Sequence, residues 1–461
     1  MNINIISFIN TFVLGPVLPL ILFIVGIYFF CKFRFFIIRF PFKIMKVFIK
    51  RSDTPDAVSP FKAVTMALAG TLGVGNIVGV ATAITAGGSG AVFWMLISAV
   101  ASILIKYSEI VLAVKYRQSH NNKSEFFGGA MYYIRDGLGK NKLAVMFAVV
   151  CLMSSFTLGN IIQVNAAANA FDMVFNIPPI AVGVFFAITS FIVIWGGIKS
   201  ISELTAKLIP LLSLTFIAFS MYIIIINYHM IPDIIISILS EAFKPSSAIG
   251  GIGGFIIMKS LRFGVARGIM SNEAGCGTAP IAHAGACTNS PAEQGCWGIF
   301  EVFVDTVILC SMTALVILIY KQNYSIEYDG IILALKAYES CLGSLADYVI
   351  SISVLCFAFG TVICWSYYGI ECIRFLSSNP LWVKLYIIVY CLIAVYGSGA
   401  SNNIIWELSD FFTGIMTVVN TVCVCGMTSV IKQVTDAYFF ASSVPKKILL
   451  SSDLSKGRAG S

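Results

Sequence analysis

The stretch AGTLGVGNIVG at residues 69–79 decides the architecture that this sequence predicts. It lies inside a hydrophobic run, residues 61–86, that is long enough to cross a bilayer. Glycine is poorly committed to a helix, so four glycines here predict that a membrane helix opens. Opened backbone groups at membrane depth must be buried in protein or line a watery cavity, which predicts a pocket. The alternative interpretation is that these glycines let two membrane helices pack closely without a break in either. The glycines are Gly70, Gly73, Gly75 and Gly79.

The composition is that of a polytopic, all-α membrane protein. Of 461 residues, 58% are hydrophobic and 11% are charged, whereas soluble domains carry roughly 25% charged residues. A requirement of about 20 apolar residues per span gives about eleven transmembrane helices. We expect them at residues 12–31, 61–86, 90–114, 143–170, 179–197, 201–226, 248–287 (broken), 296–320, 347–373, 381–398 and 404–431.

Lysine and arginine gather in alternate loops, which orients the chain. The basic loops at residues 32–62, 115–142 and 374–384, and the tail from residue 432, should be cytoplasmic. With an odd number of spans, the N-terminus then lies outside and the C-terminus inside. The net charge of +8 is attributed to these loops beside anionic lipid, with no nucleic acid partner. We expect a multi-pass protein of the cell (plasma) membrane, the inner membrane of a bacterium or archaeon.

Two connecting stretches are expected to lie at the membrane surface. Residues 41–49 are basic and amphipathic, which predicts a segment along the cytoplasmic face. Residues 232–243 mix apolar and acidic side chains, which fits a short lid, a surface helix or an ordinary connecting loop.

A second interrupted helix is expected in residues 248–287, a run too long for one ordinary span. The break is placed at residues 272–280, with residues 263–268 as the alternative. An acidic residue at membrane depth is expensive, so Glu273 should pair, and Arg267 or Arg262 is its expected partner. His283 is interpreted as a hydrogen-bonded packing residue rather than a proton carrier.

The two breaks divide the chain into two units of five spans. Leaving out the first helix, each unit opens with a broken helix, and an odd number of spans inverts the second unit relative to the first. Open N–H ends suit an anion and open carbonyl ends suit a cation, so the solute should be a small carboxylate moving with Na⁺. The expected parts are 1–60 (extra helix and basic segment), 61–226 (first repeat), 227–247 (extracellular connection), 248–431 (second repeat) and 432–461 (cytoplasmic tail).

Several stretches make a family resemblance specific. The sequence resembles the alanine or glycine:cation symporter family (sodium:alanine symporters) of the amino acid–polyamine–cation superfamily. This resemblance implies the leucine-transporter-like fold of five plus five inverted helices, with one extra N-terminal helix, and sodium-coupled uptake of alanine or glycine. The stretches are GTLGVGNIVGVATAITAGGSGAVFW (70–94), KYSEIVLAVKYR (106–117), GGAMYYI (128–134), GVARGIMSNEAGCGTAPIAHA (264–284) and WSYYGIECI (365–373).

The resemblance also implies a substrate and cation site at the first break. Backbone N–H groups of the turn at residues 73–76 would hold the substrate carboxylate. Carbonyls just before the turn and a hydroxyl from the eighth core helix would hold Na⁺, the co-transported ion. The substrate positions here are Thr71, Gly73, Val74, Gly75 and Asn76, and the cation positions are Ala69, Leu72 and Thr361.

The remaining candidates come from three other segments. Gln163 is expected to contact substrate, while Asn165 is expected to bridge helices. Trp365 lies one helical turn after Thr361 and would limit the size of the pocket. Carbonyls near Asn272 and Gly275 would meet the substrate amino group, and Cys276, in a variable part of the SNEAG motif, would touch the side chain.

The leading hypothesis is a secondary symporter that imports a small neutral amino acid with Na⁺ by alternating access. A proton-coupled transporter, with Glu273 or Asp305 titrating, stays open, as does a sensor that binds amino acid without transport. A channel would need repeated polar or charged pore positions, which the sequence lacks. The three histidines have no metal spacing and no nucleotide-binding loop or nucleophile motif occurs, so the chain is not expected to be an enzyme.

Overall fold

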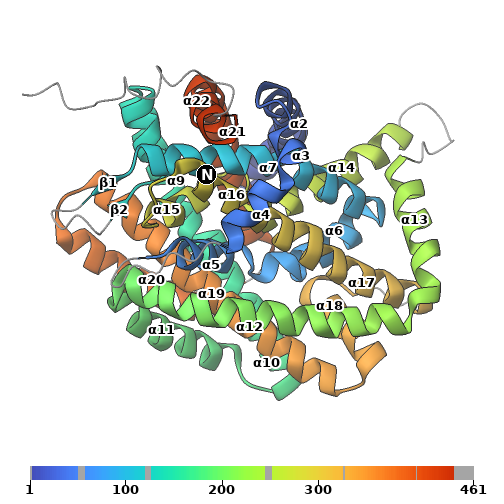
Figure 1. Ribbon diagram of the computed structural model, residues 1–461. Helices are drawn as coiled ribbons and strands as arrows, with labels where there is room; N and C mark the ends of the chain where they lie inside the picture. The colour runs from blue at the N-terminus through green and yellow to red at the C-terminus, as the bar shows by residue number, and fades with distance from the viewer. Residues whose placement is uncertain are drawn as a thin grey trace, which may run out of the picture.

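The computed structural model describes residues 3–49, 58–119, 126–243, 252–324, 328–400 and 402–440, almost all of them helical (Figure 1). Within these residues, eight helices are long and apolar enough to cross a membrane, and one bent pair raises the number to nine. The prediction of an all-α polytopic membrane protein is therefore confirmed. The exception to helix is one short antiparallel pair in the loop after residue 115, β1 (Gln118–Ser119) with β2 (Phe126–Phe127).

The N-terminal segment forms an apolar helix followed by short basic helices. The helix α2 packs against α7, α14 and α21, so the extra helix is attached to the rest of the bundle. The predicted surface segment at residues 41–49 forms α4, which packs against α16. The bounds are α1 (Ile3–Phe8), a π-helical turn (Ile9–Leu14), α2 (Gly15–Lys32), α3 (Phe36–Arg39) and α4 (Pro41–Ile49).

The next stretch contains the first broken helix and the spans that follow it. Its two halves meet at an angle of 59°. The bounds are α5 (Pro60–Thr71), a 3-10 turn (Val74–Asn76), α6 (Val78–Gly87), α7 (Gly90–Lys115), α8 (Ala130–Tyr132), a π-helical turn (Tyr133–Gly137), α9 (Asn141–Phe156), a π-helical turn (Thr157–Ile161), α10 (Ile162–Phe175), α11 (Pro179–Trp195) and α12 (Gly197–Ile226).

The remaining helices include three that lie between or after the predicted spans. The mixed stretch at residues 232–243 is helical, and helices also occupy part of the loop before residue 346 and the start of the tail. The bounds are a 3-10 turn (Tyr228–Met230), α13 (Ile231–Phe243), α14 (Ile252–Asn272), α15 (Ala279–Ala284), α16 (Pro291–Val302), a π-helical turn (Phe303–Cys310), α17 (Ser311–Asn323), α18 (Gly330–Leu342), α19 (Leu345–Leu376), α20 (Pro380–Ser398), α21 (Asn402–Gly426) and α22 (Thr428–Phe439).

Several sequence boundaries need correction or stay open. The loop at residues 321–346 contains α18, and the span placed at 404–431 ends at Gly426, because the chain breaks before α22. The span predicted at 179–197 forms α11, which is a shorter apolar helix. The span predicted at 248–287 forms the pair α14 and α15. That α11 and the pair α14 and α15 also cross the membrane, which would bring the number of spans to about eleven, stays a prediction. The tail beyond residue 440 lies outside the described residues.

Proline and a capping side chain start several of these helices. Ser59 precedes Pro60 at the start of α5 and accepts a hydrogen bond from the N–H of Lys62 (3.3 Å). Ser290 precedes Pro291 at the start of α16 and accepts one from the N–H of Glu293 (3.2 Å). Proline loses nothing at the first helical position, where its missing N–H would be unpaired, so both helices begin where the sequence places this pair.

The helices that occupy corresponding places in the two predicted repeats pack against each other. The pairs are α7 with α16, α10 with α19, and α11 with α20. The broken helices α5 and α14 lie inside this arrangement, and α14 contacts both α6 and α7. The interior of the bundle is thus built around the two breaks.

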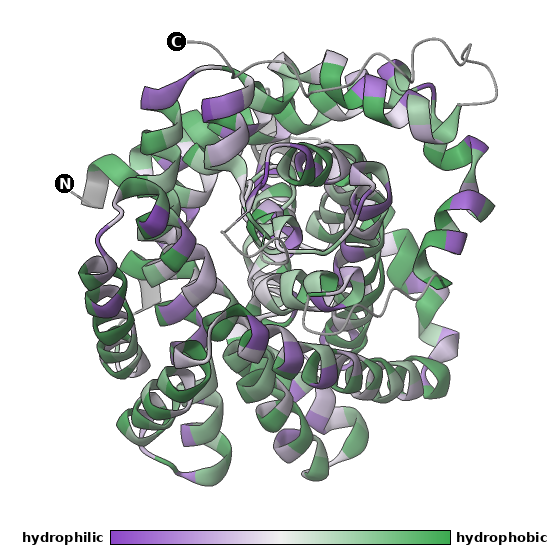
Figure 2. Cartoon of the chain, turned by 60° about the vertical axis from the view of Figure 1, so that its left-hand side comes forward, coloured by the Kyte–Doolittle hydropathy of each residue, from purple (hydrophilic) through white to green (hydrophobic). Residues whose placement is uncertain are grey.

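The surface of the bundle is apolar where lipid would lie. Large hydrophobic side chains point outward from the outer helices, and green residues predominate along the ribbon in Figure 2. Such a surface is an aggregation liability in water but matches hydrocarbon in a bilayer. Examples are Ile24 on α2, Ile192 on α11, Leu211 on α12 and Leu392 on α20.

A close crossing of α2 and α7 gives a test of the packing. A Cβ added at Gly26 would lie 2.2 Å from the carbonyl oxygen of Ala101, a backbone atom that cannot move alone. Gly26→Ala should therefore destabilise the protein by about 1–3 kcal/mol, the usual cost of overpacking. Thermal unfolding of the purified protein in detergent measures this effect as a lower Tm.

Gly399→Ala is the matched control, because a Cβ there meets nothing within 4 Å and the residue has a negative φ of −105°. The control should leave the Tm unchanged. Equal Tm values for the two variants would show that α2 does not cross α7 this closely.

Candidate functional site

The first break opens between α5 and α6, at the glycines that the sequence singles out. Gly73 is extended (φ −106°, ψ −151°), and a single 3-10 turn follows before α6 begins. The N–H of Val74 donates to Oε1 of Gln163 (2.9 Å), whose amide nitrogen donates to the carbonyl of Leu158 (3.0 Å). The structure thus brings Gln163 to the break, where its side-chain oxygen occupies one of the amides predicted to bind a carboxylate.

The predicted cation ligands Ala69 and Thr361 meet at the carbonyl end of α5. The Thr361 hydroxyl lies 2.8 Å from the carbonyl oxygen of Ala69 and 3.2 Å from that of Phe357 on its own helix. Leu72 follows at the end of α5, with its N–H bonded to the carbonyl of Leu68 (2.6 Å). These are hard oxygen donors of the kind that an open helix end offers to Na⁺. Their role as ion ligands stays a prediction.

Only glycine fits at position 73. An added Cβ would lie 2.5 Å from Oγ1 of Thr361 and 2.6 Å from Oε1 of Gln163. Those two atoms belong to the candidate cation site and the candidate substrate site. The two candidate sites therefore meet at the Cβ position of Gly73, which has no room for a side chain.

The carboxylate of Asp305 ties the two breaks together. It accepts hydrogen bonds from Nδ2 of Asn76 (2.7 Å) at the first break and from Oγ of Ser271 (2.6 Å) at the end of α14. Thr306 adds a third (2.8 Å). Asp305 lies in the π-helical turn between α16 and α17, a wider turn of a kind often found at functional sites. Asn76 keeps its Oδ1 buried without a hydrogen-bond partner among the described residues.

The second break lies where the sequence placed it first, between Asn272 and Ala279, and α14 is continuous through residues 263–268. Three residues adopt positive φ here, Glu273 (52°), Gly275 (90°) and Gly277 (78°). The Asn272 side chain fastens the open end, because its Oδ1 accepts from the N–H of Ala274 (2.9 Å) and its Nδ2 donates to Thr306 (3.0 Å).

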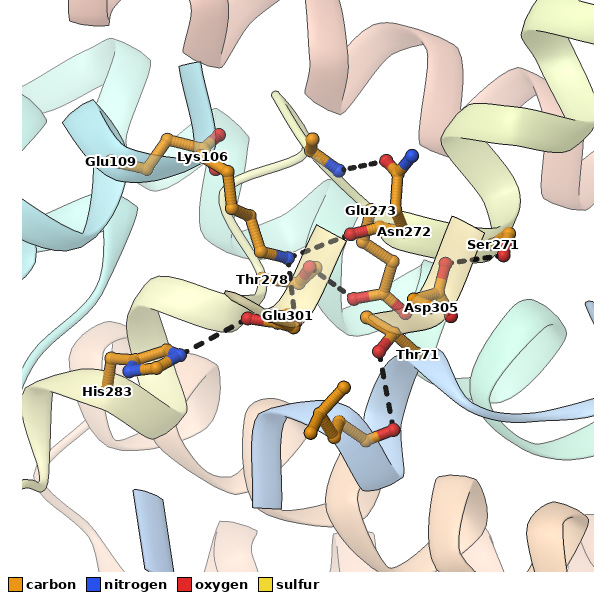
Figure 3. Close-up of polar contacts among 12 residues, drawn as sticks. Thr71, Lys106, Glu109, Ser271, Asn272, Glu273, Thr278, His283, Glu301 and Asp305 are labelled. Carbon is orange, nitrogen blue, oxygen red and sulfur yellow. Dashed lines mark hydrogen bonds and ion pairs between the residues drawn. The ribbon is translucent and has the colours of Figure 1, made fainter. Parts of the chain in front are cut away.

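The expected pairing of Glu273 with an arginine is wrong. Glu273 accepts from Nε1 of Trp365 (3.0 Å) and from Oγ1 of Thr278 (2.5 Å), as part of the cluster in Figure 3. Arg267 forms a two-pronged pair with Asp410 on α21 (2.9 and 3.0 Å). Residues six apart point about 120° away from each other around a helix, and Glu273 lies beyond the helix end.

The other predicted site residues lie within the same region, with varied partners. Thr71 donates only to Leu68 of its own helix (3.3 Å). Trp365 is buried, with its ring against Gly159. Cys276 and the carbonyl of Gly275 face α21, where they contact Thr417 (3.2 Å) and Asn420 (2.8 Å). Their contacts with substrate stay predictions.

The expectation that Asn165 bridges helices is confirmed, and the interpretation of His283 as a packing residue stays a prediction that its contacts fit. Asn165 on α10 donates to the carbonyls of Gly397 (3.1 Å) and Ala400 (2.9 Å) at the end of α20, so it bridges helices. His283 is fully buried between Gln294 (2.8 Å) and Glu301 (3.3 Å).

A buried charged group at the second break was missed by the sequence reasoning. Lys106 on α7 pairs with Glu301 on α16 (2.9 Å) and donates to the carbonyl of Asn272 (2.8 Å), and all three are fully or almost fully buried. Glu109, one turn further along α7, accepts from the N–H of Gly277 (3.1 Å) and from Asn420. Charged residues inside apolar runs were the available signal, since such residues mark sites in membrane proteins.

One cavity is large, while the breaks themselves are closely packed. The cavity has a volume of about 830 Å³ and is lined from α6, α10, α14, α18 and α21, including Val78, Asn165, Arg267 and Asp410. The cavity beside Gly73 measures about 10 Å³, room for a single water. Within the described residues no three His, Cys, Asp or Glu side chains could hold a metal ion together.

Known proteins resemble this one in architecture and in sequence. A manganese transporter of Eremococcus coleocola superposes with a TM-score of 0.51 at 14% identity, over 87% of this chain and 92% of that one. The chain matches the sodium:alanine symporter family over residues 1–447. It is 34% identical over 446 residues to the sodium/alanine symporter AgcS of Methanococcus maripaludis, covering 95% of this chain and 97% of AgcS. It is 38% identical over 439 residues to an uncharacterized transporter of Haemophilus influenzae, covering 95% and 96%.

The fold, with two interrupted helices joined at its centre, is that of a multi-pass helical membrane protein. The sequence comparisons then define the group within that class. The chain belongs to the sodium:alanine symporter family, as the resemblance implied, and it is a cation-coupled amino acid symporter and not an enzyme.

Position 73 gives a direct test of the site. Gly73→Ala should displace the Thr361 hydroxyl and the Gln163 side chain while the fold persists, because both neighbours are side-chain atoms. If an overpacking cost of about 1–3 kcal/mol falls on the binding-competent state, amino acid affinity should fall about 5- to 150-fold. Binding of labelled alanine to purified protein measures it.

Gly79→Ala is the matched control, since a Cβ at Gly79 on α6 meets nothing within 4 Å. It should bind as the unmodified protein does. Unchanged binding by Gly73→Ala, at an unchanged Tm, would remove position 73 from the site.

Proposed function

We propose that this protein imports alanine or glycine together with Na⁺ by alternating access. The observation that carries the proposal is that two sets of polar atoms meet at Gly73. The Thr361 hydroxyl, which contacts the Ala69 carbonyl, and the Gln163 amide oxygen both lie where a Cβ on Gly73 would be. A cation and a carboxylate bound there would share one short segment of backbone, which would couple their binding.

The substrate carboxylate would bind the N–H groups of Val74, Gly75 and Asn76. Those groups form the open N-terminal end before α6, which favours negative charge. Gln163 would release the N–H of Val74 as the carboxylate arrives, because its oxygen is an acceptor in the same position. This exchange replaces a neutral acceptor with a charged one, which makes a stronger hydrogen bond.

The substrate amino group would bind the carbonyl of Met270 on α14. In a continuous helix that carbonyl would accept from the N–H of Ala274, but the Asn272 side chain holds that N–H instead. The carbonyls of Asn272 and Gly275 already accept from Lys106 and Asn420. A Cβ on Gly75 would lie 3.6 Å from the Met270 carbonyl, so the two binding ends are close together. Such a short span suits an α-amino acid with a small side chain.

The cation would be Na⁺, held by the carbonyls of Ala69 and Leu72 and the hydroxyl of Thr361. Binding would turn the Thr361 proton away from the Ala69 carbonyl, so that both oxygens direct lone pairs to the ion.

Basic residues orient the chain with its N-terminus outside and its C-terminus cytoplasmic in the cell membrane. In that orientation the 830 Å³ cavity opens to the outside, as the entry to the site.

Uptake of labelled alanine and glycine by the purified protein in liposomes tests this proposal. An inward Na⁺ gradient should drive accumulation, while a K⁺ gradient alone should not. Thr361→Val, which keeps the shape and removes the hydroxyl, should raise the Na⁺ concentration for half-maximal uptake by about tenfold or more, the equivalent of roughly 1.4 kcal/mol.

Thr361→Ser is the control, because it keeps the hydroxyl, and its Na⁺ dependence should stay close to that of the unmodified protein. Accumulation driven by a proton gradient without Na⁺ would assign the coupling to H⁺ and to Glu273 or Asp305. Amino acid binding with no flux under any gradient would identify a sensor and contradict the proposal.

A further inference from the structure

The carbonyl ends of the two broken helices have different partners. At the end of α5 the partner of Ala69 is the neutral hydroxyl of Thr361 (2.8 Å). At the end of α14 the partner of the Asn272 carbonyl is the ammonium group of Lys106 (2.8 Å). Each open end carries partial negative charge from unpaired carbonyls and the helix dipole. One end therefore faces a neutral group, and the other faces a cation fixed to the protein.

Lys106 is held firmly in this position. Its side chain crosses from α7 to the break and is 0% exposed, as is that of Glu301, its ion-pair partner on α16 (2.9 Å). Figure 3 shows the ammonium between the Asn272 carbonyl and Glu301. His283 contacts the other oxygen of Glu301 (3.3 Å), which fixes the carboxylate. A buried ammonium group is costly unless it has ion-pair and hydrogen-bond partners, so Lys106 depends on Glu301 and on the Asn272 carbonyl.

Two further acidic side chains lie near the ammonium. Glu273 lies just beyond Asn272, Glu109 lies one turn further along α7, and both side chains are at most 1% exposed. Glu109 keeps one carboxyl oxygen, Oε2, buried without a hydrogen-bond partner among the described residues. The carboxylate of Glu301 and the open carbonyl end together form a place that attracts a cation, and the cation present is Lys106.

We propose that Lys106 is a tethered cation that occupies, at the second break, the place a second co-transported Na⁺ would take. The inference rests on the proposed Na⁺-coupled symport and deepens it by assigning the coupling ratio. Because Lys106 cannot leave, only the first break exchanges an ion during the cycle. One Na⁺ then moves with each amino acid, and Lys106 acts as a positioning residue that keeps the end of α14 charged and closed.

The coupling ratio of the unmodified protein is the primary test. Liposomes that contain the purified protein are loaded with labelled alanine. The membrane potential at which the net flux of alanine stops is then measured at fixed Na⁺ and alanine gradients. The potential should match one Na⁺ per alanine. A potential that matches two would overturn the proposal, whereas an absence of any Na⁺-driven flux would contradict the proposed function instead.

Charge removal at position 106 provides the second test. Lys106→Met leaves Glu301 and the carbonyl end without a cation, so Na⁺ should fill the place, and the Hill coefficient for Na⁺ should rise from about 1 to about 2. Lys106→Met combined with Glu301→Gln removes both charges, and its Hill coefficient should return to about 1. Lys115→Met, at the exposed end of the same helix, is the matched control and should behave as the unmodified protein.

A Hill coefficient that stays at about 1 in folded Lys106→Met would overturn the proposal. Folding of each variant is checked by size-exclusion chromatography and Tm. If the single variant does not fold, the coupling ratio of the unmodified protein decides the matter, with the outcomes already stated.

Discussion

The carboxylate of Asp305 is the contact on which the centre of this structure depends. It holds Asn76 at the first break and Ser271 at the second through hydrogen bonds of 2.7 and 2.6 Å. An interrupted membrane helix exposes backbone groups that hydrocarbon cannot satisfy, so each break requires partners supplied by other helices. A single carboxylate from a π-helical turn serves both breaks and thereby keeps them face to face.

The two breaks divide the work between them. At the second, side chains already satisfy the exposed backbone, since Asn272, Glu109, Asn420 and Lys106 each bind a group in or beside the open segment. At the first, the key contacts are made by a hydroxyl from Thr361 and an amide side chain, groups that can exchange partners without leaving a charge unpaired. The first break is therefore suited to the cation and the substrate carboxylate, while the second mainly holds the frame and leaves the Met270 carbonyl for the substrate amino group.

Much of the fold could be predicted from the sequence because its signals are local. Glycine clusters inside apolar runs locate both breaks, and the run lengths locate most helices. The helix α18 was missed because its thirteen residues are too few for a span, and a rule based on length cannot detect it. The misassigned partner of Glu273 came from proximity along the chain, which does not determine proximity around a helix.

The site could be predicted only in part, because local sequence signals do not report which side chains meet when helices pack. Gly73 and Thr361 were singled out by the family resemblance and Gln163 by its polar amide in a membrane helix, and the structure brings the three together. The pairing of Lys106 with Glu301 depends on how α7 and α16 pack, which no local pattern reports. A single sequence marks such charges as unusual but does not identify their partners.

A structure of the protein determined with alanine and Na⁺ is the most direct test of the central claim, that the first break holds both ligands. It should show the alanine carboxylate at the N–H groups of Val74 to Asn76 and an ion between the Ala69 carbonyl and the Thr361 hydroxyl. Alanine bound only in the outer cavity near Arg267, with the 2.8 Å contact between Ala69 and Thr361 intact, would contradict the account.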